Sequence, residues 1–101
     1  MEYTESKSGD SCEVKMKGKF TFSDHEKFRE IISIIKNGGV SGVSIDVSGI
    51  EFVDSAALGM LLIAREEAEK GGINLVLRNP NGQISKMFKV SKFDSLFNIE
   101  Q

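Results

Sequence analysis

Few side chains in this sequence are placed to do chemistry, and the most informative pair is Asp54-Ser55. Asp54 stands directly before a segment with helical spacing, where an N-cap carboxylate accepts hydrogen bonds from backbone N–H groups of the first turn. Ser55 then takes the first helical position, where free amides and the helix dipole would stabilise a phosphate of about −1.5 to −2 charges. Helix rules alone favour an ordinary helix start, but the pair also fits a phosphorylation site.

A phosphate on Ser55 would put like charge beside the Asp54 carboxylate. Added charge of one sign disfavours a partner that fits the unmodified surface. Phosphorylation at this position would therefore act as an electrostatic switch.

The other chemically capable side chains have simpler structural explanations. His25 has no Ser or Cys nucleophile motif beside it, so we assign it to the surface. Cys12 alternates with apolar residues, which indicates core packing, and a single cysteine allows no internal disulfide. Glu66 and Glu67 are expected on a solvated helix face. Without a phosphate loop or metal cluster, the sequence predicts no enzyme, no cofactor and no metal site.

Composition narrows the classes of partner. The chain has 101 residues, with 13 basic and 15 acidic side chains and a formal net charge of −2. No basic block could neutralise a phosphate backbone, so we expect no nucleic-acid partner. The polar start and the lack of a run of roughly 18 apolar residues predict no direct membrane insertion and a cytoplasmic protein. The length predicts one domain over 1–101.

Hydrophobic spacing predicts the strands that must position Asp54-Ser55. Alternating apolar residues predict strands at 12–16 and 43–47, and a short apolar run predicts another at 73–77. Residues around Tyr3 are expected to form an antiparallel edge through a turn at Gly9-Asp10. We expect the chain to turn at Ser48-Gly49 after the second of these strands.

Spacings of three and four residues predict the helices. One follows a capping box at Ser23 and Glu26, one begins at Asp54, and a shorter one covers 84–88, with a terminal turn or strand at 96–99. Strand, helix, strand order favours right-handed parallel crossovers. The fold class is α/β, with a mixed, mainly parallel sheet, an antiparallel N-terminal edge and three to four flanking helices. Asp54-Ser55 follows a parallel strand, at the sheet end where such folds place working groups.

The stretch DVSGIEFVDSAALGMLL resembles a motif of STAS domains, D-x-S-x-[apolar]-x-[aromatic]-[apolar]-D-S-[small]-G-L-G-x-L. The match combines Asp46 to Ser48, Phe52, the Asp54-Ser55 pair and Leu58-Gly59, and the element order agrees over essentially the full length. The chain looks most like bacterial anti-sigma factor antagonists. The resemblance implies phosphorylation of Ser55 within a switch region made of Asp54, Ala56, Ala57, Leu58 and Gly59.

The resemblance also implies a cycle of partner switching. The unphosphorylated protein would bind a serine kinase with a histidine-kinase-like ATPase fold, or an anti-sigma-type regulator. Phosphorylation would release it, and a PPM-type phosphatase would reset it. Thr21, Ser23 and Asp24 match a region that family members present to the kinase, although helix capping also explains Ser23 and Asp24.

Two departures from the family pattern point to a divergent regulatory branch, such as biofilm or secretion control. Ala57 stands where the family generally has Gly, and Lys19 with Thr21 replaces acidic residues. The alternative function is a constitutive STAS subunit of a bacterial lipid-transport ATPase, in which Ser55 need not be phosphorylated.

Overall fold

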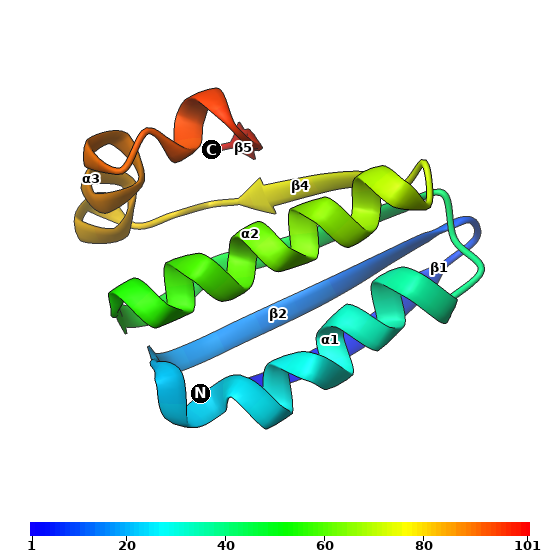
Figure 1. The fold of residues 1–101 in the computed structure, drawn as a ribbon, viewed down its shortest axis with the longest axis horizontal. Helices are drawn as coiled ribbons and strands as arrows, with labels where there is room; N and C mark the ends of the chain where they lie inside the picture. Colours follow the sequence, from blue (N-terminus) through cyan, green and yellow to red (C-terminus); the bar gives the residue numbers. More distant parts are fainter.

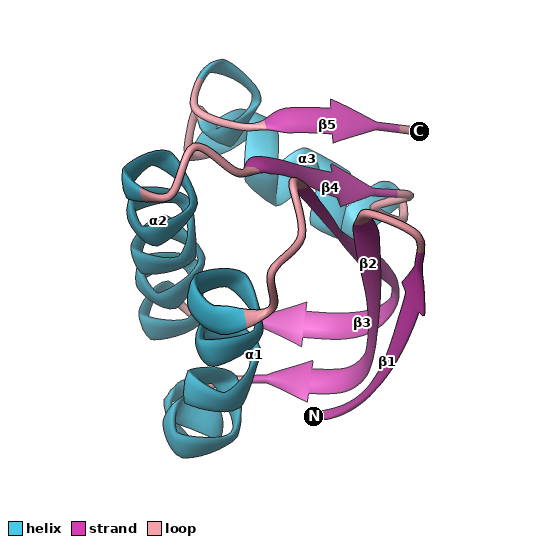
Figure 2. Cartoon of the chain, turned by 90° about the vertical axis from the view of Figure 1, so that its right-hand side faces the viewer, coloured by secondary structure: helices cyan, strands magenta, loops and turns pink.

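The computed structural model describes residues 1–101 and folds them around one five-stranded sheet (Figure 2). The strands, in spatial order, are β1 (Glu2–Ser8), β2 (Ser11–Phe20), β3 (Gly42–Val53), β4 (Asn74–Arg78) and β5 (Asn98–Glu100). β1 pairs antiparallel with β2, and every other pairing is parallel. The predicted mixed sheet with an antiparallel N-terminal edge is confirmed.

Three α-helices and two short 3₁₀ turns connect the strands. They are η1 (Phe22–Asp24), α1 (His25–Asn37), α2 (Ser55–Lys70), α3 (Gly82–Val90) and η2 (Phe93–Ser95). α1 and α2 lie side by side across one face of the sheet, whereas α3 lies beyond the carboxyl end of β4 (Figure 1). The amino end of α2 and the 3₁₀ turn η1 lie at the same end of the sheet.

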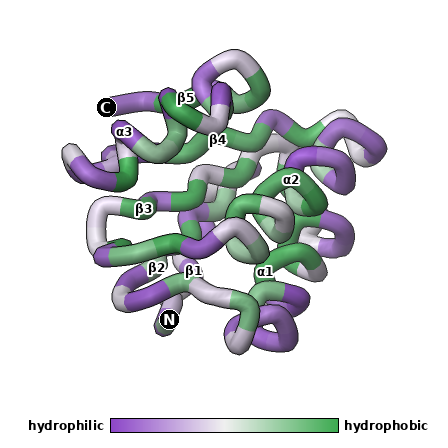
Figure 3. The backbone as a smooth tube through the Cα atoms, turned by 60° about the vertical axis from the view of Figure 1, so that its left-hand side comes forward, coloured by the Kyte–Doolittle hydropathy of each residue, from purple (hydrophilic) through white to green (hydrophobic).

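The core lies between the sheet and the two long helices. The alternating residues of β2 and β3 turn inward, and the helices add residues spaced by three and four, such as Phe28, Ile31, Leu61 and Ala64. Cys12 is buried in this core, as predicted. Figure 3 shows hydrophobic segments of β2 and β3 facing those of α1 and α2. Burial of each large side chain contributes about 1.5–3 kcal/mol, so this cluster fixes how α2 sits on the sheet.

The turn predicted at Ser48-Gly49 is wrong, because β3 continues to Val53. The β2–β3 register shifts between Lys15 and Lys17, which absorbs the irregularity without ending the strand. Gly49 lies so close to β2 that an added Cβ would stand 2.9 Å from the Cβ of Lys17. Glycine is therefore present for close backbone approach, and the longer β3 carries the chain directly to Asp54.

The capping box predicted at Ser23 and Glu26 is also wrong. The chain enters α1 through η1, so the box forms earlier, between Thr21 and Asp24. The Thr21 backbone N–H donates to Asp24 Oδ2 at 2.9 Å. The sequence pattern marked the helix start but not the extra 3₁₀ turn that precedes it.

Two surface assignments also change. His25 is half-buried, and its ring stacks on Phe22 with centroids 5.0 Å apart. Glu67 is half-buried as well and forms ion pairs with Lys36 (3.9 Å) and Lys70 (3.6 Å). Both side chains therefore contribute to packing or to linking elements of the fold.

Candidate functional site

The carboxyl ends of β2 and β3 bring the two predicted site segments together. The Asp54 backbone N–H donates to the Phe20 carbonyl at 3.3 Å, which continues the β2–β3 pairing past Val53. Asp54 Oδ2 in turn accepts a hydrogen bond from the Phe22 N–H at 3.1 Å. The loop that enters α1 is thus fastened to the residue that starts α2.

Asp54 caps α2, as the sequence predicts. Its backbone is extended, and its Oδ1 accepts a hydrogen bond from the Ala57 N–H at 2.8 Å. One carboxylate therefore satisfies an amide of the first turn of α2 and an amide of η1. Such an N-cap typically stabilises a helix by about 1 kcal/mol over alanine.

Ser55 is the first residue of α2, and its side chain is exposed. Its hydroxyl makes no hydrogen bond within the chain, so Oγ is free to react with an approaching group. The N–H groups of Ser55 and Ala56 have no intrahelical carbonyl partner, because they belong to the first turn. Free amides and the positive end of the helix dipole provide a favourable environment for an added phosphate.

The remaining residues of the predicted switch region differ in accessibility. Ala56, Leu58 and Gly59 are partly exposed on the surface around Ser55, whereas Ala57 is fully buried in the core. A side chain larger than alanine at Ala57 would have to displace core atoms. Ala57 therefore supports the site from within and presents no surface to a partner.

The predicted contact residues of the neighbouring loop are also near the site. Ser23 is exposed, and its Oγ lies 2.9 Å from Thr21 Oγ1. Asp24 is engaged internally, because its carboxylate accepts from the Thr21 N–H and from the Met1 amino group at 2.8 Å. Burial opposes ionisation of Asp24, but these hydrogen bonds outweigh it and hold its pKa below the usual range.

Two exposed apolar side chains near the site were not singled out as site residues from the sequence. Phe22 is 63% exposed and Ile63 is 49% exposed. Ile63 could have been found, because it falls off the three-and-four spacing formed by Ala57, Leu61 and Ala64. An isoleucine outside the buried stripe of a helix indicates a surface apolar position.

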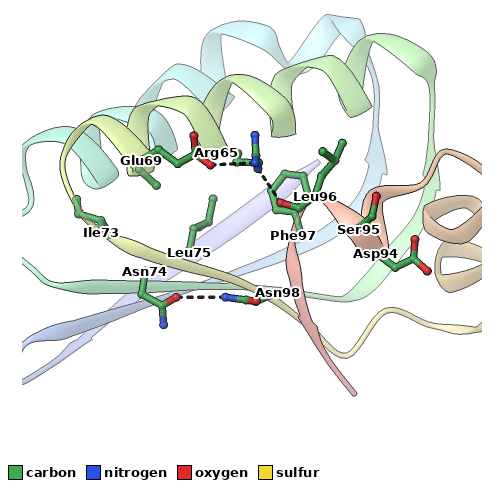
Figure 4. Close-up of a pocket in the computed structure, with 11 residues that line it drawn as sticks. Arg65, Glu69, Ile73, Asn74, Leu75, Asp94, Ser95, Leu96, Phe97 and Asn98 are labelled. Atoms are coloured by element: carbon green, nitrogen blue, oxygen red, sulfur yellow. Dashed lines mark hydrogen bonds and ion pairs between the residues drawn. The ribbon is translucent and has the colours of Figure 1, made fainter.

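A polar hollow of about 350 Å³ lies at the other end of α2, against the C-terminal segment (Figure 4). Arg65 Nε donates to the Leu96 carbonyl at 2.6 Å, and its guanidinium pairs with Glu69 at 2.9 Å. Asn98 Nδ2 donates to Asn74 Oδ1 at 3.4 Å. The polar side chains of the hollow therefore have partners within the chain. The Arg65 hydrogen bond to Leu96 helps to hold α2 against the C-terminal segment that leads into β5.

The chain contains no cluster of three His, Cys, Asp or Glu side chains that could hold a metal ion. None of its helices combines the length and apolar character needed to cross a membrane.

Comparisons with known proteins agree with this architecture. Residues 3–98 match the family model described as "Mlab, STAS domain". A STAS-domain containing protein of Pseudomonas aeruginosa (strain UCBPP-PA14) is 31% identical over 97 residues, which cover 93% of this chain and 92% of that protein.

Solved structures share the fold at low sequence identity. A putative anti-sigma factor antagonist from Thermotoga maritima has a TM-score of 0.89 at 16% identity, over 98% of this chain and 86% of that one. Phosphorylated SpoIIAA of Bacillus has a TM-score of 0.74 at 20% identity, over 99% of this chain and 92% of that one. With the sheet order, the helix placement and the family model in agreement over nearly its whole length, this chain belongs to the STAS domain family.

Proposed function

We propose that this protein is a phospho-regulated binding module in which unmodified Ser55 permits docking to a partner and phosphorylated Ser55 releases it. The observation that carries the proposal is the free, exposed hydroxyl at the first position of α2, beside unpaired amides. Support also comes from structural neighbours that are anti-sigma factor antagonists, including SpoIIAA in unphosphorylated and phosphorylated forms. STAS domains of this kind generally bind other proteins and do not act as enzymes.

The phosphate would change the surface and leave the fold intact. Ser55 is solvent-exposed and Asp54 keeps its capping bonds through the carboxylate, so neither must move to admit the group. The added negative charge is favourable toward the helix dipole but unfavourable toward a partner that fits the unmodified surface around Asp54. Release therefore follows from charge and bulk at the docking surface.

The cycle requires two enzymes that act on this chain. A serine kinase with a histidine-kinase-like ATPase fold would transfer the γ-phosphoryl group of ATP to Ser55 Oγ, releasing ADP and the hydroxyl proton. A PPM-type phosphatase would hydrolyse the phosphoester with water and release inorganic phosphate. Its metal ions belong to the phosphatase. We place this cycle in the cytoplasm.

Binding measurements with Ser55 variants test the proposal. Ser55→Asp is expected to abolish docking to the purified cognate kinase, and Ser55→Ala is expected to dock constitutively with unchanged folding. Ser6→Asp, which adds the same charge on the exposed edge strand β1, is the matched control and should bind like wild type. Equal affinity of Ser55→Asp and wild type would refute the switch.

The second candidate function is a constitutive STAS subunit of a bacterial lipid-transport ATPase. The observation in its favour is the description of the family model that matches residues 3–98. That description reads "Mlab, STAS domain" and names no anti-sigma factor antagonist. This function predicts stable co-purification with ATPase and permease subunits, whatever charge stands at Ser55.

A further inference from the structure

An apolar groove of about 520 Å³ runs between α1 and α2, next to the amino end of α2. Phe28, Ile32 and Met60 line it from the two helices, and Phe22 and Ile63 stand at its edges. One helical turn beyond Ile32 and Ile63, the ion pair between Lys36 and Glu67 joins the helices. The groove is therefore bounded at that end and open toward Ser55, whose neighbour Ala56 also lines it.

The apolar side chains at the edges of this groove are exposed and do not belong to the buried core. Phe22 and Ile63 remain 63% and 49% exposed although both are large and apolar. The Phe22 ring is held outward by stacking on His25, and His25 Nδ1 lies 3.0 Å from the Phe22 carbonyl. Apolar side chains fixed at the edges of a hollow are typical of a protein-binding surface.

Gly59 gives an independent indication that the groove is kept open. Glycine inside a helix costs up to about 1 kcal/mol relative to alanine. Here nothing in the chain requires it, because an added Cβ would meet no atom within 4 Å. Since Gly59 lines the groove, the space that it leaves is available to a group from outside the chain.

The charge of the residues that line the groove indicates which kind of partner segment would bind there. Arg29 is the only lining residue with a permanent charge, and it makes no ion pair within the chain. An occupant with apolar side chains and a carboxylate at its flank would satisfy both the lining and Arg29.

We propose that this groove binds an amphipathic, acidic helix of the partner protein. Apolar side chains spaced by three, four and seven residues would enter the groove, and a carboxylate would pair with Arg29. The coupling to Ser55 rests on the proposed function: a phosphate at the open end of the groove would repel the acidic helix. The partner's contact is thus assigned to the α1–α2 side of the site.

A displayed library of random helical peptides of about four turns tests this proposal on the full chain. Selection on wild type is expected to enrich peptides with helical apolar spacing and Asp or Glu beside it. Gly59→Leu fills the groove and should lower the affinity for these peptides by at least about tenfold. Gly82→Leu, the matched control, makes the same exchange at an exposed glycine of α3 outside the groove, where an added Cβ also meets no atom within 4 Å, and should change their affinity by less than about twofold. Circular dichroism and urea unfolding check that both variants fold.

A charge variant completes the test. Arg29→Glu should reverse the preference, so that Lys-flanked versions of the enriched peptides bind better than Glu-flanked ones. Enrichment of no peptide, enrichment without acidic residues, or equal binding to wild type and Gly59→Leu would overturn the proposal. Self-association that Gly59→Leu abolishes in sedimentation experiments would also overturn it, because the occupant would then be a second copy.

The failure of the groove and the failure of the switch have different signatures. If Gly59→Leu retains binding of the kinase while Ser55→Asp loses it, the groove is wrong and the switch stands. If Gly59→Leu loses peptide binding while Ser55→Asp still binds both the peptides and the kinase, the groove stands, and the switch and its coupling to the groove are wrong.

Discussion

At the scale of single residues, Asp54 connects the two segments of the site. Its carboxylate accepts from Ala57 in α2 and from Phe22 in η1. We predict that Asp54→Ala lowers the free energy of unfolding by about 1–2 kcal/mol, because the cap is lost and the second amide loses its partner. Asp94→Ala removes an exposed acid from a 3₁₀ turn and should change it by less than about 0.5 kcal/mol. Urea unfolding measures both, and equal losses would contradict the bridging role.

Asp46 provides a prediction for pH. It is 9% exposed, and burial alone would raise its pKa, but hydrogen bonds from Ser48 and Asn79 outweigh burial and hold the pKa below its usual range. A carboxyl group whose pKa is lower in the folded state than in the unfolded state stabilises the fold at pH values above its unfolded-state pKa. This contribution is lost as the pH falls through the folded-state pKa. We therefore expect stability to fall below about pH 4, less steeply in Asp46→Asn. Acid titration of both proteins by circular dichroism checks this, and identical acid limbs would contradict it.

At the scale of elements, two glycines should respond in opposite ways to the same change. At Gly49 a Cβ would press on β2, 2.9 Å from the Lys17 Cβ and 3.0 Å from the Met16 carbonyl. We predict that Gly49→Ala lowers the free energy of unfolding by about 1–3 kcal/mol. Gly59→Ala meets open space inside α2 and should raise it by up to about 1 kcal/mol. Urea unfolding of the two variants decides, and a shift of the same sign in both would contradict this account of Gly49.

The elements also show what sequence patterns can predict. Alternation and three-and-four spacing predicted the strands and helices correctly, because they report burial on one face. The Gly9-Asp10 turn and the cap at Asp54 followed from local backbone rules. The continuation of β3 through Gly49 could not be predicted, since it depends on how closely β2 approaches. The α1–α2 groove was likewise hidden, because it arises only when two helices pack together.

At the scale of the whole molecule, Arg65 links α2 to the C-terminal segment, which also pairs through the three residues of β5 and buries Phe93 and Phe97 in the core. We predict that Arg65→Ala speeds amide hydrogen exchange in β4–β5 and η2 while β2–β3 keep their protection. Arg29→Ala removes an arginine that makes no ion pair, and should leave exchange in all strands unchanged. Mass-detected exchange of both variants measures the difference. Uniform loss of protection in Arg65→Ala would show that this link supports the whole core.

The central claim is that Ser55 is the position of a phosphate switch. The most direct measurement is intact-mass and peptide mass spectrometry of the protein purified from its native host and after incubation with candidate serine kinases and ATP. The account predicts one phosphate, mapped to Ser55, that disappears on treatment with a PPM-type phosphatase. A Ser55 that stays unmodified under every condition, in protein that co-purifies with transporter subunits, would contradict it.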